Sequence, residues 1–214
     1  MTLDNILEEI KKANTIAIVV HENPDGDAIG SALAMKLALE QLNKEADVII
    51  PEYPSAFSFL PGVEKIKKES DIQEYDLAIA LDCASIRLLN GFAKYFDNAK
   101  VKVAIDHHSS NTMYADYNFI SQDSPACAQL LLVAFSYFGI EVTKEIGTCI
   151  LAGIITDTGG FRYSTVTAET FRFVAELCEK GVKVSQIYDK VHNKGRRRKS
   201  WSRKRGLRRN CRKW

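Results

Sequence analysis

The loop formed by residues 21–27 combines one histidine and two aspartates, a combination that can bind a metal ion. The loop reads His-Glu-Asn-Pro-Asp-Gly-Asp and supplies His21, Asp25 and Asp27. Imidazole nitrogens and carboxylate oxygens together suit manganese, iron, cobalt or zinc. Proline and glycine favour a bend that turns the three side chains inward. A purely structural explanation also exists, because Asp-Gly is a common turn pair and Asp27 could cap a following helix.

Three further segments share one sequence pattern, in which an apolar run is followed by an aspartate or a histidine. Asp82 follows Ala-Ile-Ala-Leu, and Asp157 follows Gly-Ile-Ile-Thr. The third run, Val-Ala-Ile, is followed by Asp106, His107 and His108, which include two of the four histidines in the chain. Burial of a carboxylate without a partner costs on the order of several kcal/mol, so a bound cation is the simplest explanation for such positions. The four segments together therefore predict a site for divalent cations.

The elements that must position these residues follow an alternating pattern. Short segments rich in Val, Ile and Ala alternate with longer helical patterns, which predicts an α/β fold: a parallel β-sheet with helices on both faces. The expected strands are residues 15–20, 47–51, 76–82 and 101–106. The expected helices are residues 27–42, 124–139, 144–158 and 167–179, the second of which should open at Ser124-Pro125. Open α/β sheets bind ligands at the carboxyl ends of their strands, where most of these polar residues fall.

Taken together, the four segments resemble the DHH phosphoesterase family over roughly residues 15–181. The run Asn-Pro-Asp-Gly-Asp-Ala-Ile-Gly-Ser at 23–31 and the run Thr-Asp-Thr-Gly-Gly-Phe-Arg-Tyr-Ser at 156–164 are most similar to the RecJ-like branch. That branch contains bifunctional oligoribonucleases that are also adenosine 3′,5′-bisphosphate phosphatases. Family II inorganic pyrophosphatases share the metal motifs but usually have threonine at the position of Gly26.

The resemblance implies a metal-dependent phosphoesterase that hydrolyses short oligoribonucleotides or nucleotide 3′-phosphates. Two alternatives stay open. One is an inorganic pyrophosphatase or exopolyphosphatase of the same superfamily, and the other is a truncated, non-catalytic protein that binds metal or RNA. The expected partner is therefore a short RNA or a nucleotide phosphate.

The resemblance also implies two metal ions, with Asp82 shared between them. The implied ligands are His21, Asp25 and Asp82 for one ion, and Asp27, Asp82, His107 and Asp157 for the other. Manganese is expected first, with magnesium or cobalt as alternatives, because mixed imidazole and carboxylate ligands suit it. Two such ions about 3.5–4 Å apart can activate water for in-line attack on a phosphate.

Further roles carry over from the same resemblance. His108 would face the phosphate as a proton donor or charge-stabilising group, and Asp106 would orient a histidine. With Asp82, these two are the expected catalytic residues. For Gly159 and Gly160, two interpretations stay open: their amides could bind a substrate phosphate, or the glycines could form the turn that ends a helix.

The charge distribution divides the chain near residue 193. Residues 1–193 hold 17 basic residues and all 27 acids, whereas residues 194–214 hold 12 basic residues and no acid. We expect residues 1–193 to be a DHH domain, without the DHH-associated domain that usually follows it. The basic tail, with Trp201 and Trp214, could be a nucleic-acid-binding arm or a disordered segment. A frameshift is a further hypothesis, since a shifted frame could encode an amphipathic helix, and the coding DNA would decide it.

Composition restricts the remaining classes. The chain of 214 residues is 46% apolar, enough for a sizeable core. It lacks an apolar run of about 18–20 residues and a signal-peptide pattern, so we expect a cytoplasmic protein with no membrane association. A homodimer is among the expected assemblies. The five cysteines form no Cys-x-x-Cys pair and are expected to be reduced, with Cys83 a small filler and Cys149 and Cys178 core residues.

Overall fold

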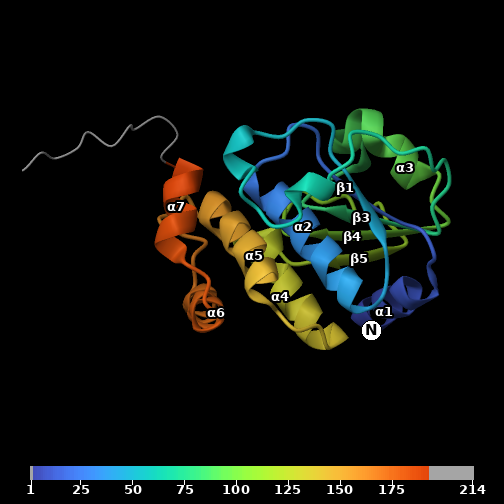
Figure 1. Ribbon diagram of the computed structural model, residues 1–214. Helices are drawn as coiled ribbons and strands as arrows, with labels where there is room; N and C mark the ends of the chain where they lie inside the picture. The colour runs from blue at the N-terminus through green and yellow to red at the C-terminus, as the bar shows by residue number, and fades with distance from the viewer. Residues whose placement is uncertain (1, 193–214) are drawn as a thin grey trace, which may run out of the picture.

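The computed structural model describes residues 2–192, which form a parallel five-stranded sheet surrounded by helices (Figure 1). The strand order is β2-β1-β3-β4-β5, and each strand runs parallel to its neighbours. The strands are β1 (Ile16–Val20), β2 (Ala46–Ile49), β3 (Leu77–Leu81), β4 (Val101–Asp106) and β5 (Tyr117–Ile120). The predicted parallel α/β fold is confirmed, and the four predicted strands end within two residues of the observed ones.

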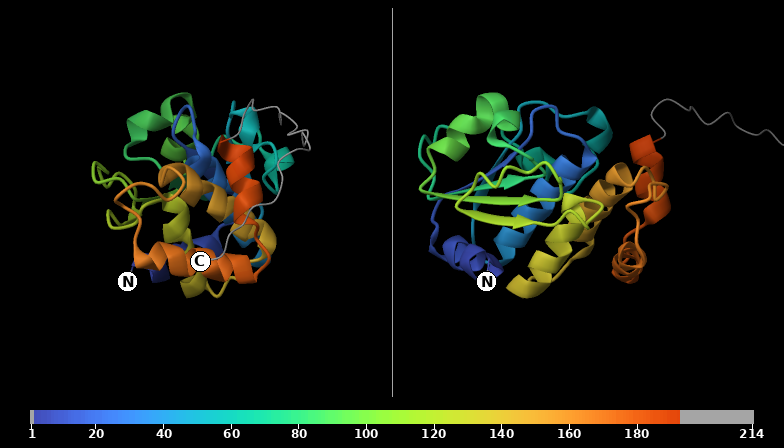
Figure 2. Two further views of the ribbon diagram at one scale, coloured as in Figure 1. Left: turned by 90° about the vertical axis from the view of Figure 1, so that its left-hand side faces the viewer. Right: turned by 180° about the vertical axis from the view of Figure 1, so that it is seen from behind.

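Helices cover both faces of the sheet. Figures 1 and 2 show α2, α4 and α5 side by side on one face, α3 on the other, and α6 and α7 beyond α5. The helices are α1 (Thr2–Lys12), α2 (Gly26–Gln41), α3 (Ala93–Asp97), α4 (Cys127–Phe138), α5 (Lys144–Asp157), α6 (Ala168–Glu179) and α7 (Val184–His192). Three short 3-10 helices are η1 (Ser55–Phe57), η2 (Val63–Lys65) and η3 (Ile86–Phe92).

Alternate residues of the central strands point into two separate hydrophobic clusters. In β1, Ile16 and Ile18 belong to the cluster under α2, α4 and α5, whereas Ala17 and Val19 belong to the cluster under α3. All five residues of β1 are buried. A strand covered on both faces needs apolar residues at every position. This explains why the strands were recognisable as continuous apolar runs.

The predicted elements do not include α1, α3, β5 and α7. The edge strand β5 has only partly buried residues, so it lacks the apolar run that marks the central strands. Helix α3 has five residues, too few to show a helical period. Helix α6 agrees with its prediction, because Thr167 caps it and accepts a hydrogen bond from the Thr170 amide.

The start of α4 corrects the prediction made from Ser124-Pro125. Ser124 does not cap the helix: its hydroxyl donates to the carbonyl oxygen of Ala126 at 2.8 Å. Ala126 is extended, with φ of −161° and ψ of 147°, so the helix begins only at Cys127. The extended residue between the proline and the helix explains why the Ser-Pro pair is not the opening turn.

Helices α2 and α5 pack closely because small residues face each other. A Cβ atom at Gly30 would lie 2.5 Å from the carbonyl oxygen of Cys149, and one at Gly153 would lie 2.6 Å from Asp27 Oδ1. Both distances are shorter than real Cβ contacts allow. The two glycines therefore set the spacing that brings the end of α5 against the start of α2.

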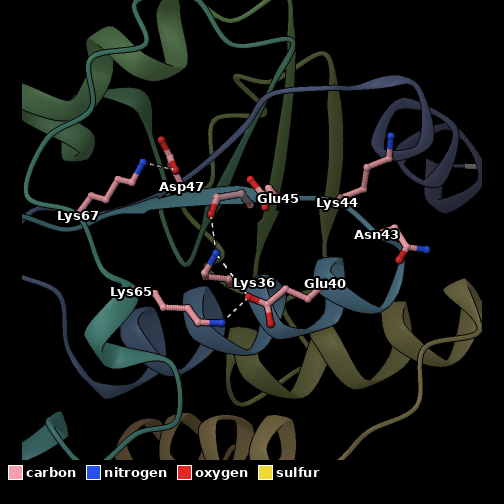
Figure 3. A pocket seen from close by; sticks show the side chains of 9 residues that line it. Lys36, Glu40, Asn43, Lys44, Glu45, Asp47, Lys65 and Lys67 are labelled. Atoms are coloured by element: carbon pink, nitrogen blue, oxygen red, sulfur yellow. Dashed lines mark hydrogen bonds and ion pairs between the residues drawn. The ribbon is translucent and has the colours of Figure 1, made fainter.

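A groove of about 730 Å³ lies beside the edge strand β2, and Figure 3 shows its charged lining. Both lysines and acids line it, and several of them form ion pairs. Lys65 Nζ lies 2.8 Å from Glu40 Oε1, and Lys67 Nζ lies 2.7 Å from Asp47 Oδ1. The groove therefore presents compensated charge. We call it the lysine groove; it is lined by Lys36, Glu40, Asn43, Lys44, Glu45, Ala46, Asp47, Lys65 and Lys67.

Backbone contacts around the lysine groove cover the free edge of β2. The Lys67 amide donates to the carbonyl oxygen of Val48 at 2.8 Å, and the Ile50 amide donates to that of Lys67 at 2.9 Å. Lys36 Nζ donates to the carbonyl oxygen of Ala46 at 2.8 Å. Unpaired strand edges can recruit other chains, and lysines with a bridging segment reduce that tendency.

Among residues 2–192 the cysteines follow their predictions with one exception, and Cys211 lies outside the described residues. Cys83, Cys127 and Cys149 are buried free thiols, but Cys178 is exposed, because it lies on the outer side of the amphipathic α6. Burial raises the pKa of Cys83 to about 11, which keeps the thiol protonated and agrees with a packing role. None of the helices within residues 2–192 combines the length and apolar character needed to cross a membrane.

Candidate metal centre

The carboxyl ends of β1, β3 and β4 meet at one edge of the sheet, because these strands are direct neighbours. His21 follows β1, Asp82 follows β3, and Asp106 ends β4. Asp27 lies in the first turn of α2, and Asp157 is the last residue of α5. The close approach of α2 and α5 carries these last two acids to the same edge.

The predicted ligands come together in overlapping groups whose ligand atoms lie within 4.8 Å of one another. The groups are His21, Asp25 and Asp82; Asp27, His107 and Asp157; and Asp82, His107 and His108. All six predicted metal ligands belong to them. We call these six residues, His21, Asp25, Asp27, Asp82, His107 and Asp157, the ligand cluster.

Asp82 lies in the middle of the ligand cluster. Its Oδ2 is 3.8 Å from His21 Nε2, and its Oδ1 is 3.4 Å from His107 Nε2. The residue is 2% exposed and has a φ of 52°, a left-handed conformation that is unusual outside glycine. Backbone strain of this kind persists where the surroundings impose it, often at functional sites. The strained backbone turns the two oxygens of Asp82 toward different histidines.

Asp27 is fully buried and connects the ligand cluster to the start of α4. Its Oδ2 accepts a hydrogen bond from the Cys127 amide at 2.6 Å, and its Oδ1 accepts one from the Ala128 amide at 2.9 Å. Asp27 therefore caps α4 from another helix, which corrects the structural alternative that it caps α2. Asp25 caps α2 instead, accepting from the amides of Asp27 and Ala28.

Burial and mutual repulsion dominate the ionisation of the carboxylates. Burial raises the pKa of Asp27 well above its usual value, and the nearby charges of Asp82 and Asp157 raise it further. Burial likewise raises the pKa of Asp82, although His107 partly opposes this. Several carboxylates are therefore held close together in a buried place. A bound cation would offset both the cost of burying their charges and their mutual repulsion.

His107 directs its Nε2 toward the acids at the centre of the cluster. Its Nδ1 lies 3.2 Å from the Ser124 carbonyl oxygen and donates to it, which leaves Nε2 facing the acids. Nε2 is 3.1 Å from Asp157 Oδ2. Burial alone would lower the pKa of His107, but the carboxylates of Asp157 and Asp82 outweigh it and raise the pKa to about 11.

The cluster fits the divalent cations that its residue types suggest. Two of its buried atoms, Asp82 Oδ1 and His107 Nε2, have no hydrogen-bond partner among the described residues. Buried polar atoms are almost always paired, so such atoms require an explanation. Carboxylate oxygens and imidazole nitrogens aimed at one another are ligand sets for divalent transition metals.

His108 stands beside the ligand cluster and is oriented by a chain of hydrogen bonds. Its Nδ1 donates to Asp106 Oδ1 at 2.7 Å, and Asn111 Nδ2 donates to Asp106 Oδ2 at 2.7 Å. The hydrogen bond with Asp106 raises the pKa of His108. Because Nδ1 is engaged, the half-buried ring can present Nε2 to a substrate.

Comparison with known proteins fits this arrangement. Residues 15–154 match the family model described as DHH family, N-terminal domain. The chain belongs to the DHH family. Over 189 residues it is 34% identical to the bifunctional oligoribonuclease and PAP phosphatase NrnA of Thermus thermophilus, which covers 87% of this chain and 57% of that protein.

Two further similar proteins extend the comparison. Over 173 residues the chain is 26% identical to an Exiguobacterium protein named "Probable manganese-dependent inorganic pyrophosphatase", covering 78% of this chain and 55% of that one. A solved exopolyphosphatase-related protein from Bacteroides fragilis superposes with a TM-score of 0.85 at 28% identity, covering 90% of this chain and 60% of that one. The chain thus spans less than two thirds of each of these relatives.

Gly159 and Gly160 lie in the turn that follows α5. The Gly159 amide donates to the Thr156 carbonyl oxygen, and the Gly160 amide donates to that of Ile155 at 2.8 Å. Both glycines have positive φ, 57° and 71°. These bonds favour the turn that ends α5, because the amides are used inside the protein.

Sequence reasoning missed Asn111. It lies in a loop, and no apolar run or helical period precedes it. Its only sequence signal is its position three residues after His108. Its hydrogen bond to Asp106 became visible only in three dimensions.

Proposed function

We propose that this chain carries the metal-dependent active site of a phosphoesterase acting on short oligoribonucleotides or nucleotide 3′-phosphates. The observation that carries this proposal is a pair of buried ligand atoms, Asp82 Oδ1 and His107 Nε2, that face each other among carboxylates and have no hydrogen-bond partner among the described residues. Buried polar atoms are almost always paired, and bound cations would supply the partners that these two atoms lack.

Two divalent cations, manganese first, would be held by two sets of ligands that share Asp82. The sets are His21, Asp25 and Asp82, and Asp27, Asp82, His107 and Asp157. When bound, such cations neutralise phosphate oxygens and lower the pKa of a water molecule that attacks the phosphorus. The similarity to a protein named as manganese-dependent supports the choice of metal.

His108 is the proposed proton donor to the leaving oxygen. Asp106 holds its Nδ1, so the ring presents Nε2 toward the substrate side with a fixed orientation. The raised pKa of His108 favours the protonated ring, the form that donates. Asp106 and Asn111 act through His108 and are positioning residues.

Two observations favour a nucleotide substrate over pyrophosphate. The relative with 34% identity is named an oligoribonuclease and PAP phosphatase. In addition, a Cβ atom at Gly26 would lie 2.4 Å from Thr156 Cγ2 and 2.8 Å from the Phe57 ring. Threonine, the usual residue of family II pyrophosphatases at this position, would clash with the side chains of Thr156 and Phe57 unless they moved.

A manganese-supplemented assay that compares a dinucleotide, adenosine 3′,5′-bisphosphate and pyrophosphate tests the proposal. We expect hydrolysis of the first two, and loss of that hydrolysis in Asp82→Ala. Hydrolysis of pyrophosphate alone would instead establish the pyrophosphatase alternative.

The cytoplasmic location and the homodimer stay predictions. The basic tail at 194–214 lies outside the described residues.

A further inference from the structure

A second cavity, of about 260 Å³, adjoins the ligand cluster at His21. Its floor is the carboxyl end of β1 and β2, formed by Val20, Ile49 and Ile50. His21 belongs both to the cavity lining and to the ligand group with Asp25 and Asp82. A group attached to a phosphate at the cluster therefore has this cavity as its immediate neighbour. We call it the His21 cavity.

The His21 cavity has apolar walls and an acidic rim. Pro24, Pro51 and Phe92 line it, together with the acidic residues Glu22 and Glu52. The described residues that line the cavity include no lysine and no arginine. A second phosphate would meet two carboxylates and no fixed cation, so the lining disfavours pyrophosphate or polyphosphate at this place.

The shape of the cavity is fixed by the backbone. The Glu22 amide donates to the Leu88 carbonyl oxygen at 2.7 Å, which ties the β1–α2 loop to η3. The Ile50 amide donates to the Lys67 carbonyl oxygen at 2.9 Å, which holds the end of β2. A preformed cavity loses little entropy when a ligand enters.

We propose that the His21 cavity binds the nucleobase next to the scissile phosphate and prefers a base with an exocyclic amino group. This inference rests on the proposed function and deepens it. Cavities for drug-sized ligands measure about 300–1,000 Å³, so a slightly smaller one suits a single ring system. The apolar walls and Phe92 match the faces of a base, and carboxylates accept hydrogen bonds from amino groups such as that of adenine or cytosine. Uracil presents carbonyl oxygens there, which the carboxylates repel.

Amide chemical shifts of the ¹⁵N-labelled full chain test the proposal, with Mg²⁺ as the diamagnetic cation. The probes are AMP, UMP, ribose 5-phosphate and pyrophosphate. We expect AMP to shift the amides of Glu22, Asn23, Ile50 and Glu52, and to bind about tenfold more tightly than UMP or ribose 5-phosphate. Equal affinities for AMP and ribose 5-phosphate, or for AMP and UMP, would overturn the proposal.

A pair of charge reversals adds a matched control. Glu52→Lys should remove the AMP preference while Mg²⁺ affinity stays within about twofold. Glu45→Lys, an equally exposed site in the lysine groove, should leave the preference unchanged. A preference that survives Glu52→Lys would count against the cavity. If pyrophosphate binds and no nucleotide does, the proposed function itself fails, which is a separate result.

Discussion

The ligand cluster at the ends of β1, β3 and β4 and the lysine groove beside β2 are both rich in charged side chains. In the lysine groove two of the three acids have a lysine partner: Lys65 lies 2.8 Å from Glu40, and Lys67 lies 2.7 Å from Asp47. In the ligand cluster, acids face acids and histidines, and Asp82 Oδ1 has no hydrogen-bond partner among the described residues.

Burial makes this difference meaningful. The side chains of Lys65 and Glu40 are 46% and 37% exposed, so water screens their charges. Asp27 and Asp82 are 0% and 2% exposed, and their mutual repulsion is not screened in that way. Carboxylates that are buried and lie close to one another therefore favour a bound cation more strongly than exposed acids that pair with lysines. On this ground the proposed metal site lies at the ligand cluster rather than in the larger lysine groove.

The largest expected effect comes from removing the central carboxylate of the cluster. Asp82→Asn keeps the size of the side chain and tolerates positive φ, but it removes the shared negative charge. We expect manganese-stimulated hydrolysis to fall by about 100- to 1,000-fold. Asp47→Asn in the lysine groove is the control and should keep activity within about twofold. Comparable losses in both variants would show that the comparison between the two regions is wrong.

Metal binding should also stabilise the folded chain. A cation that binds only the native state, at 100 times its Kd, stabilises it by about 2.7 kcal/mol. We expect Mn²⁺ to raise Tm by about 5–10 °C, EDTA to reverse the increase, and Asp82→Asn to abolish it. An unchanged Tm at saturating Mn²⁺ would refute a native metal site, whether or not the chain turns over substrate.

A smaller effect is expected for the residue that orients the proton donor. Asn111→Ala removes the hydrogen bond to Asp106 and should lower kcat about tenfold, while Mn²⁺ affinity stays unchanged. The ¹⁵N chemical shifts of the His108 ring nitrogens should change, because the ring loses its fixed tautomer. Asn43→Gly in the lysine groove is the matched control. Weaker Mn²⁺ binding in Asn111→Ala would mean that Asn111 supports the cluster as a whole.

The smallest effect belongs to the lysine groove itself. Lys67→Ala breaks an exposed ion pair with Asp47, and such pairs contribute about 0.2–1 kcal/mol. Urea denaturation should show a loss of this size that shrinks at high salt. Activity should not change, and a large activity loss would require a role for the groove beyond covering the edge of β2.

The strands and the ligand residues could be predicted because their signals are local. Central strands buried on both faces must be apolar at every position, so an acid or histidine at their ends is conspicuous. Asp82 and His107 were found in this way. Asn111 and the His21 cavity could not be found, because both depend on contacts between segments far apart in the chain. Strand β5 was missed because an edge strand is only partly buried.

The sequence by itself determined the residue types at the strand ends, and with them the chemistry of imidazole and carboxylate ligands. Only the tertiary structure decided which strand ends meet. The order β2-β1-β3-β4-β5 makes β1, β3 and β4, the strands that end at the ligand cluster, direct neighbours. It leaves β2 at the edge of the sheet, beside the paired charges of the lysine groove. It also decided that Asp27 caps α4 rather than α2, because the glycines at α2 and α5 allow the helices to approach. The types of the ligand residues are a local property of the chain, whereas their meeting in one cluster depends on packing between distant segments.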